Sequence, residues 1–228
     1  MADESKRIIK VDYKAYLADR NTLYDTTNAD AAKEAGLFNE NYTYSPFPYI
    51  EGSSKVFDGL GEAFLAAEIG KETEVTIPCE KAAGKSDTKQ IQFVPMNVFQ
   101  KKNVYPQVGM TVNIENRTGT IVSVGAGRVK VDFNSPLAGH DLLYKFTVVE
   151  EVKEPVDKVK AIVEAYYNRT DNMEYEICED KVVIKENDFC KYDSAWTQSK
   201  FKIVADIRSV LGINRIDFIQ TWDIPKKE

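Results

Sequence analysis

The fold of this 228-residue chain is decided by one stretch, Phe47-Pro-Tyr-Ile-Glu-Gly-Ser-Ser-Lys-Val-Phe-Asp-Gly-Leu-Gly-Glu-Ala-Phe-Leu65. Its first four residues, Phe47–Ile50, include large β-prone side chains and predict an extended segment. The following Glu51–Ser54 predicts a tight turn, because glycine and serine favour irregular backbone. A strand, a turn and a short helix therefore bring four apolar side chains together, namely Phe47, Val56, Phe57 and Leu60.

The helix of this stretch is predicted to begin near Gly59, with Asp58 as its N-terminal cap. Leu60, Phe64 and Ala67 recur at helical spacing and form one apolar stripe. We expect the helix to end by Gly70, since glycine is favoured in a left-handed C-terminal cap. From the pattern alone, each apolar residue here could equally be a core residue or part of a binding surface.

The central stretch resembles the centre of FKBP-type peptidyl-prolyl isomerases, and in particular their long archaeal, SlyD-like members. The resemblance covers Ile8–Val152. Alternating apolar residues over Ile8–Leu17 predict a half-buried strand, and a polar turn with Leu23–Thr27 completes a hairpin similar to the first hairpin of that fold. A short helix, Asp30–Gly36, is predicted in an insertion that long archaeal members share. The matching central residues are Phe47, Gly52, Val56, Phe57, Gly59 and Leu60.

A second insertion lies between Lys85 and Asp132, where the simple isomerase fold has only a short flap. Such a length far exceeds the ordinary connection of about 4–6 residues, so the segment is expected to have its own structure. Phe93–Phe99 resembles the motif that opens the insert-in-flap domain of SlyD-like proteins. Three strands are predicted after it, at Val108–Ile114, Gly119–Val124 and Arg128–Phe133.

The rest of the chain supplies further strands and a C-terminal unit. Glu72–Pro78 and the alternating Leu142–Val148 are expected to belong to the isomerase sheet. In the last helix Phe201, Val204 and Ile207 are spaced for one apolar face. Beyond a charged boundary the predicted elements are a helix (Val156–Tyr167), a hairpin (Met173–Cys178 and Lys181–Lys185), a helix (Ala195–Leu211) and a strand (Arg215–Trp222).

We therefore expect an α+β protein in three parts. Residues 1–87 and 133–152 are expected to form an antiparallel FKBP-type sheet wrapped on a short helix. Residues 88–132 are expected to form a small β-rich flap domain with chaperone function. Residues 153–228 are expected to form a small α+β domain.

The resemblance also implies a pocket for a proline ring. In the family's roles, Val56 helps to form the floor, while Tyr13 and Asp25 set a polar rim. Without the resemblance, Tyr13 would be read as an inward strand residue and Asp25 as a turn residue bonded to its own backbone. The walls of the pocket would be Phe47, Phe57, Leu60 and Tyr144.

Two pocket positions depart from the family pattern. Tyr24 stands where the family usually has phenylalanine, and Ala83 stands where it has an aromatic residue, usually tyrosine. Loss of that ring and hydroxyl at Ala83 predicts a weak isomerase, although the Tyr24 hydroxyl could replace part of the missing donor.

Such a pocket needs no nucleophile, metal or proton relay. Rotation about an X-Pro bond has a barrier near ~20 kcal/mol because amide resonance must be broken. The twisted amide loses much of its dipole, so a dry aromatic slot binds it better than water does.

The insert predicts a second activity. It carries more apolar side chains than so small a unit can bury, and an exposed apolar face marks a binding site. In SlyD-like proteins the corresponding domain holds unfolded chains, and tethering raises the local concentration of prolines at the pocket. The candidate contact residues are Phe93, Val94, Met96, Val98, Phe99, Met110, Val112 and Ile114.

Composition limits the partners. The net charge of −6 gives no support to nucleic-acid binding, and no apolar run approaches the ~20 residues of a membrane span. The polar N-terminus predicts a cytoplasmic protein. One histidine, His140, and three scattered cysteines predict neither a metal site nor a cofactor, so His140 is expected at the surface and the cysteines in packing roles. The expected partners are unfolded or proline-containing polypeptides.

Two alternatives stay open beside an isomerase with holdase activity. A binding module with a vestigial pocket is favoured by Ala83. A hydrolase or transferase that uses the 36 acidic residues has no residue spacing to support it. The strand Arg215–Trp222 carries large apolar residues that a small unit covers incompletely, which favours a homodimer. Burial of these residues under the helix Ala195–Leu211 is an equal alternative.

Overall fold

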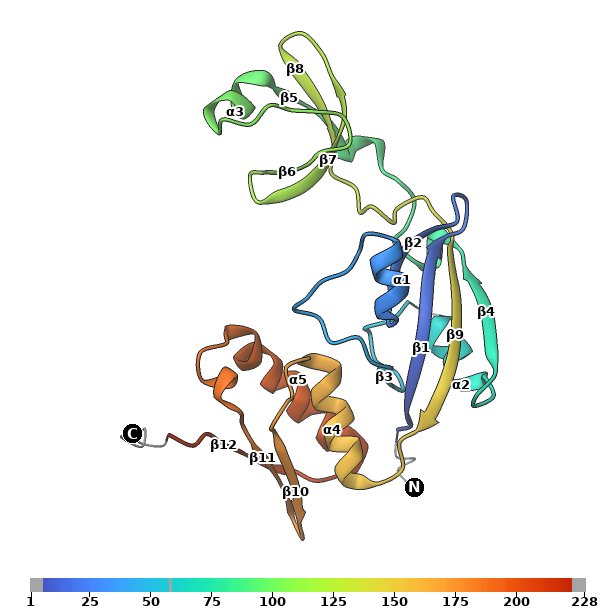
Figure 1. The fold of residues 1–228 in the computed structure, drawn as a ribbon, viewed down its shortest axis with the longest axis vertical. Coiled ribbons are helices and arrows are strands. Elements are labelled where there is room, and N and C mark those ends of the chain that lie inside the picture. The colour runs from blue at the N-terminus through green and yellow to red at the C-terminus, as the bar shows by residue number, and fades with distance from the viewer. Residues whose placement is uncertain (1–5, 58, 223–228) are drawn as a thin grey trace.

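The computed structural model describes residues 6–57 and 59–222 and contains three β-sheets. Figure 1 shows the insert at one end of the molecule, joined by two adjacent connecting segments to the N-terminal sheet, with the C-terminal unit at the other end. The fold is α+β, as predicted. No helix of the described chain is long and apolar enough to cross a membrane.

The N-terminal sheet is antiparallel throughout. Its strands run in the order β2-β1-β9-β4, and β3 pairs with β1. Alternation along the chain puts one face of the sheet toward the core, which also contains helix α2 (Leu60–Ala66). The strands are β1 (Ile8–Leu17), β2 (Thr22–Thr26), β3 (Phe47–Ile50), β4 (Glu72–Ile77) and β9 (Leu142–Glu151).

Helix α2 is shorter than predicted. It ends at Ala66, and Ala67 is already extended. Gly70 does not cap it, because the Gly70 backbone N–H donates to the Val148 carbonyl of β9 and the chain is held along that strand. The N-cap is Gly59, in left-handed backbone with φ 85°, while the expected cap Asp58 lies outside the described residues.

Close packing joins α2 to β3. A Cβ built at Gly61 would lie 2.8 Å from Tyr49 Cζ, so only glycine permits the approach without a shift. The insertion before β3 contains α1 (Ala29–Glu34), which Asn28 caps by accepting from the Ala31 N–H at 2.8 Å.

The insert is a four-stranded antiparallel sheet in the order β5-β8-β7-β6, with its own apolar core. Only three strands were predicted, because the residues of β5 and α3 lie in the motif read as a unit. The strand predicted at Val108–Ile114 begins only at Thr111, because Gly109 turns the chain with φ 85°. The elements are η2 (Thr88–Gln90), β5 (Ile91–Pro95), α3 (Met96–Lys101), β6 (Thr111–Ile114), β7 (Arg117–Val124) and β8 (Arg128–Asp132).

The two connections of the insert are tied to each other. The Gly139 N–H donates to the Gly84 carbonyl at 2.8 Å. Asp87 and Asn134 exchange two bonds, at 2.9 and 3.0 Å. The chain therefore leaves and re-enters the N-terminal sheet at nearly one point, just after η1 (Cys79–Lys81).

The C-terminal unit is a mixed sheet covered by two helices. Its strand order is β10-β11-β12, and β12 runs parallel to β11, which α5 makes possible as a crossover. The elements are α4 (Pro155–Tyr166), β10 (Glu174–Cys178), β11 (Lys181–Lys185), η3 (Asp188–Lys191), α5 (Ser194–Leu211) and β12 (Arg215–Ile219).

Two predictions about this unit were wrong in detail. Phe201 is 83% exposed, and the buried stripe of α5 instead contains Trp196, Ile203, Ile207 and Val210. The last strand ends at Ile219, so Trp222 lies beyond it and is 62% exposed.

The core of the C-terminal unit includes residues of the N-terminal sheet. Ile8 of β1 and Ile50 of β3 are buried in the same cluster as Trp196 and Ile162. Lys55 adds a polar contact, because its ammonium group donates to the Ala165 carbonyl and lies 4.1 Å from the Tyr166 ring centre. The two units therefore share one apolar contact surface.

Candidate functional site

Seven of the predicted pocket residues come together on the N-terminal sheet. Tyr13, Phe47 and Tyr144 come from β1, β3 and β9, while Val56, Phe57 and Leu60 come from the turn before α2 and from its first residue. Together with Tyr24 of β2, all belong to the apolar cluster around Phe64 and Phe146 or pack against it. We call this group of seven residues the slot.

Four aromatic rings of the slot form three ring pairs, of which Tyr13–Phe47 and Tyr24–Tyr144 stand edge to face and Tyr13–Tyr144 is tilted at 53°. The ring centres of Tyr13 and Phe47 are 6.3 Å apart at 85°. Tyr144 lies 6.0 Å from Tyr13 and 6.3 Å from Tyr24. Such contacts orient ring edges and faces and stabilise a rigid apolar wall.

Asp25 forms the polar rim with Tyr13. The Tyr13 hydroxyl donates to Asp25 Oδ2 at 2.8 Å, and the Thr26 N–H donates to Oδ1 at 2.9 Å. Burial first, and then the Asp25 charge, raises the pKa of Tyr13 well above its usual range. Tyr13 therefore stays a neutral donor, while its bond holds the exposed carboxylate in one orientation. Asp25 lies in β2 rather than in a turn, and its carboxylate accepts both from Tyr13 and from the neighbouring backbone.

The Tyr24 hydroxyl, considered from sequence as a partial replacement for the missing donor, is already hydrogen-bonded within the slot, so its role toward a substrate stays a prediction. It donates to the Tyr144 hydroxyl at 2.7 Å. That bond leaves the Tyr144 proton as the one that can be donated to another acceptor. Burial raises the pKa of both hydroxyls, so both remain protonated.

The floor of the slot is fixed by local hydrogen bonds. Leu60 is 1% exposed, and its N–H donates to the Phe57 carbonyl at 3.0 Å. Val56 and Phe57 are half-buried, so their surfaces remain partly available beside the floor.

Ala83 is half-buried in the turn after η1. Its neighbour Ala82 packs against the slot's cluster. Ala83 carries only a methyl group where the family resemblance expects an aromatic ring, so its role in the slot stays a prediction.

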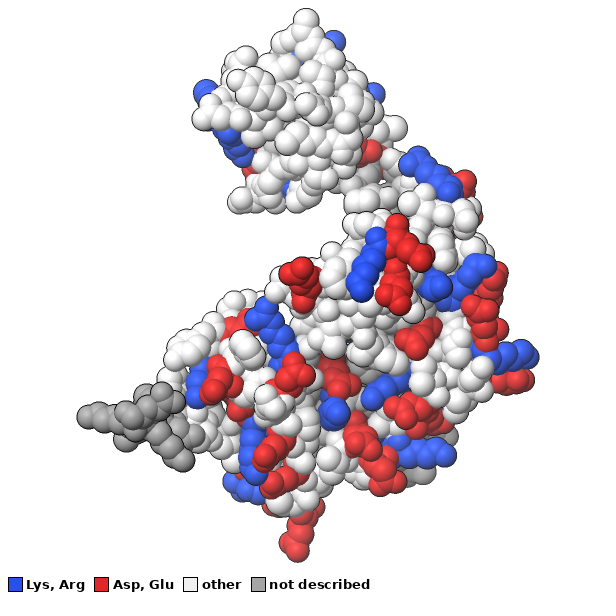
Figure 2. All heavy atoms as spheres, viewed as in Figure 1, with Lys and Arg blue, Asp and Glu red and all other residues white. Residues whose placement is uncertain are grey.

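The insert carries an apolar groove of about 170 Å³ between α3 and β6. Val98 and Phe99 come from α3, and Met110 and Val112 from the opposite side; Val104 and Lys102, which the sequence reading missed, complete the rim. Lys102 is the C-cap of α3, and the Val104 N–H donates to the Phe99 carbonyl at 3.0 Å, so both stay beside the last turn of the helix. Figure 2 shows that the visible face of the insert has few charged side chains.

The insert residues differ in exposure more than predicted. Val94, Phe99, Val112 and Ile114 are core residues, at most 8% exposed, because the four-stranded sheet covers them. Met96 and Val98 are half-buried, whereas Met110 is 40% and Phe93 is 56% exposed. Phe93 does not line the groove, and the guanidinium of Arg128 lies 4.4 Å from its ring centre.

Other candidate reactive groups lie away from the slot. His140 is less exposed than expected, because its Nδ1 lies 3.0 Å from the Asp19 carboxylate. Cys190 is buried, Cys79 is half-buried, and Cys178 is exposed, so a packing role is wrong for Cys178. Within residues 6–57 and 59–222 no group of three or more His, Cys, Asp or Glu side chains could hold a metal ion. What the slot offers chemically is an apolar, largely aromatic cluster with neutral hydroxyl groups.

Two family models match the chain. The model described as "FKBP26, IF domain" matches residues 92–137, and the model described as "FKBP26_C-terminal" matches residues 155–223.

Curated relatives match between one half and about two thirds of the chain. A short-type peptidyl-prolyl cis-trans isomerase of Methanocaldococcus jannaschii is 34% identical over 149 residues, which cover 65% of this chain and 92% of the relative. An FKBP-type peptidyl-prolyl cis-trans isomerase SlyD of Helicobacter pylori is 33% identical, covering 52% of this chain and 66% of the relative. The SlyD of Escherichia coli is 32% identical, covering 50% and 59%.

An antiparallel sheet wrapped on a short helix, with an aromatic slot and a separate flap domain, defines a SlyD-like isomerase with an insert-in-flap domain. The chain belongs to the FKBP-type peptidyl-prolyl cis-trans isomerase family.

Proposed function

We propose that the chain accelerates rotation about X-Pro bonds in unfolded polypeptides, and that its insert holds those polypeptides near the slot. The observation that carries this proposal is the slot: three tyrosines and Phe47 around an apolar floor, with neutral hydroxyls and no charged group among its seven residues. A proline ring fits such a wall, and the twisted amide is more stable there than in water.

Hydroxyl donors would position the substrate chain. The Tyr144 proton is available because Tyr24 donates to the Tyr144 oxygen. A bond to a backbone carbonyl of the substrate would orient the X-Pro bond over Leu60 without chemical participation. A bond of this kind stabilises the bound peptide and its twisted form alike, so it raises kcat/KM mainly by lowering KM.

The insert groove would hold extended apolar segments. Met110 at its rim suits varied side chains, because methionine is flexible and polarizable. Residues 88–132 carry six lysines and arginines against two acidic residues, a net charge of +4 in a chain of net charge −6. We therefore expect the insert to favour apolar segments with neutral or acidic flanks.

We also propose a cytoplasmic location and a homodimer. Free thiols at all three cysteines suit a reducing compartment.

For the dimer, β12 is an edge strand with Ile219 42% exposed and Trp222 62% exposed beside it. Sedimentation of the full chain tests this: Ile219→Lys should shift a dimer to monomer, and a wild-type monomer at high concentration rejects it. Truncation after Val152 is a poor test, because it would uncover Ile8 and Ile50.

The decisive experiment replaces Ser86–Asp132 by a short glycine-containing loop. Gly84 and Gly139 are already hydrogen-bonded across the junction, and every described residue of the slot's cluster lies outside 86–132. Turnover of a proline tetrapeptide should therefore survive, whereas catalysed refolding of a proline-limited protein should fall steeply.

The outcomes separate the alternatives. Absence of tetrapeptide turnover by the wild-type chain, with aggregation still suppressed, would favour the binding module with a vestigial slot. Equal loss of both activities on replacement of the insert would reject a separable holding function.

A further inference from the structure

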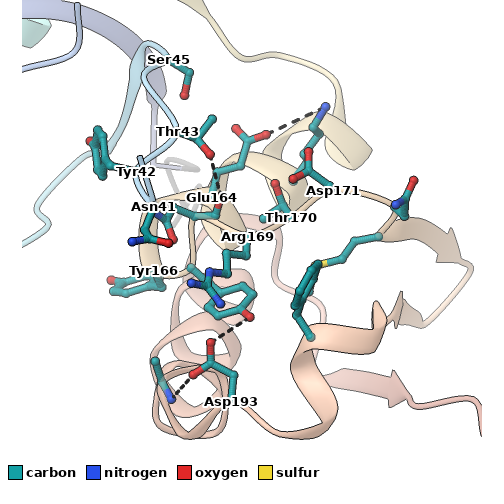
Figure 3. Close-up of a pocket in the computed structure, with 18 of the residues that line it drawn as sticks. Asn41, Tyr42, Thr43, Ser45, Glu164, Tyr166, Arg169, Thr170, Asp171 and Asp193 are labelled. Atoms are coloured by element: carbon teal, nitrogen blue, oxygen red, sulfur yellow. Dashed lines mark hydrogen bonds and ion pairs between the residues drawn. The ribbon is translucent and has the colours of Figure 1, made fainter. Parts of the chain in front are cut away.

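A second cleft, of about 1470 Å³, lies between the loop that precedes β3 and the C-terminal unit. One wall is formed by residues 41–48, and the other by the end of α4, the loop 167–173, η3 and the start of α5. Figure 3 shows Tyr42, Thr43 and Ser45 on one side, with Tyr166 and Arg169 across from them. Neither the insert groove nor the slot accounts for this cleft.

The cleft borders the slot and shares one residue with it. Phe47 is a wall of the slot and also lines the cleft. Tyr42 lines the cleft and lies close enough to the slot's rim for the Asp25 charge, after burial, to raise the pKa of Tyr42. A chain bound at the slot therefore meets the cleft at these two rings.

The walls are held at a fixed separation. Lys55 bonds the Ala165 carbonyl at the end of α4, and the Thr43 hydroxyl donates to the Asn168 carbonyl at 3.4 Å. Asn187 donates to the carbonyls of Arg169 and Asp171, both at 2.9 Å, which fixes the loop between α4 and β10. The cleft is thus built by named contacts on both sides.

The lining has the chemistry of a site for an extended polypeptide. Seven aromatic side chains line it, and several keep much of their surface exposed, such as Phe189 at 61% and Tyr192 at 81%. Tyrosines offer an apolar ring and a hydroxyl, which suits side chains and backbone of varied sequence. Four acidic residues against two basic ones give the lining a net charge of −2, which disfavours nucleic acid.

The acidic groups are available to a ligand. Asp171 is exposed, and no ion pair of its carboxylate is found among the described residues. Asp188 pairs with Lys191 at 2.6 Å but is 91% exposed. Basic side chains of a bound chain can therefore approach both carboxylates.

We propose that this cleft binds the segment of client polypeptide that flanks the proline held in the slot, and that it favours segments with lysine or arginine. This inference rests on the proposed function and extends the substrate site onto the C-terminal unit. The basic insert and the acidic cleft would then select different segments of one unfolded chain.

The test compares a proline tetrapeptide with a peptide of about twelve residues, ~40 Å when extended, that carries the same central sequence. The longer peptide is made with lysine flanks or glutamate flanks. We expect the wild-type chain to show a higher kcat/KM for the lysine-flanked peptide than for the tetrapeptide, and fluorescence anisotropy to give a lower Kd for lysine than for glutamate flanks.

The informative variant is Asp171→Lys with Asp188→Lys, which reverses both carboxylates. It should reduce the length advantage of the lysine-flanked peptide by about five- to tenfold. Glu179→Lys with Asp180→Lys makes the same change in the exposed β10–β11 turn, outside the cleft, and should leave that advantage unchanged.

A second pair of variants tests the aromatic contacts. Phe189→Ser should weaken binding of the long peptide about two- to tenfold, whereas Phe201→Ser, 83% exposed and outside the cleft, should not.

Several results overturn the proposal. One is the absence of any length advantage in a chain that turns over the tetrapeptide. Another is tighter binding of the glutamate-flanked peptide that stays the same in the Asp171 and Asp188 variant. That result would assign binding of the long peptide to the insert. A third is a change of sedimentation without a change of Kd, which makes the cleft a contact between copies. Failure on the tetrapeptide itself rejects the proposed catalysis instead, and the anisotropy measurement still reports on the cleft.

Discussion

The hydroxyl pair of Tyr24 and Tyr144 gives the sharpest prediction about catalysis. Tyr24 donates to Tyr144 over 2.7 Å, so the Tyr144 proton is the one available to a substrate carbonyl. Tyr144→Phe removes that donor and keeps the ring, which lies 6.0 Å from Tyr13. Only the hydrogen bond is deleted, since phenylalanine preserves the aromatic wall.

The magnitude follows from the bond that is lost. A neutral hydrogen bond contributes about 0.5–1.5 kcal/mol net, so kcat/KM should fall about 2- to 12-fold. A bond that positions the substrate is equally strong before and during rotation, so the loss should appear mainly in KM. Tyr24→Phe is the matched control, because it leaves the Tyr144 donor in place and should cost less.

The assay is tetrapeptide isomerisation measured over a range of substrate concentrations, with urea unfolding of each variant. Unfolding identifies any general loss of packing, because Tyr144 is only 7% exposed. Unchanged kcat/KM in Tyr144→Phe would refute the donor role. So would a larger loss in Tyr24→Phe than in Tyr144→Phe, since it would make Tyr24 the group that contacts substrate.

Three further predictions concern single positions. Ala83→Tyr should raise tetrapeptide turnover severalfold without changing aggregation suppression, because it restores a ring and a hydroxyl beside the slot; flat turnover would show that the wild-type slot lacks nothing there. Gly61→Ala should lower stability by about 1–3 kcal/mol in urea titration, since the added Cβ would lie 2.8 Å from Tyr49 Cζ, and unchanged stability would mean that Tyr49 moves freely. Burial, and then the charge of Glu186, raises the pKa of the Cys190 thiol from 9.0 to about 11. The folded state thus favours the neutral thiol, so its contribution to stability is present below pH 9 and is lost as pH rises toward 11. At pH 8 a maleimide should modify Cys178 and spare Cys190, and equal labelling rates in the folded chain would contradict this.

Much of the secondary structure is determined by the sequence alone, because it depends on local periodicity. Alternation over Ile8–Leu17 predicted β1 with its observed bounds, and Lys181–Lys185 was likewise predicted as β11. The family resemblance at Phe47–Leu65 indicated the antiparallel sheet with its short helix. These predictions were correct because each segment has one apolar face, whichever partner covers it.

The errors occur where a distant partner determines the local structure. Helix α2 ends at Ala66, and Gly70 donates instead to the carbonyl of Val148 in β9. These two residues are 78 positions apart in the chain, so local pattern cannot predict their contact. Phe201 was assigned to the buried face of α5, yet the crossover to β12 turns Trp196 and Ile203 inward instead. Spacing identifies a stripe but cannot choose between two neighbouring stripes when both contain apolar residues.

Candidate site residues were chosen by position in a family pattern, and their contacts arise only in three dimensions. The pattern marked Tyr24 and Tyr144 separately, 120 residues apart, but only pairing of their strands through β1 brings the two hydroxyls within 2.7 Å. The cleft beside Tyr42 has no sequence signature, because its walls come from a loop and from a unit more than 100 residues later. Local pattern therefore determined which segments form strands and helices, and tertiary packing decided which side chains share a site, since a shared site requires segments distant in sequence to be held together.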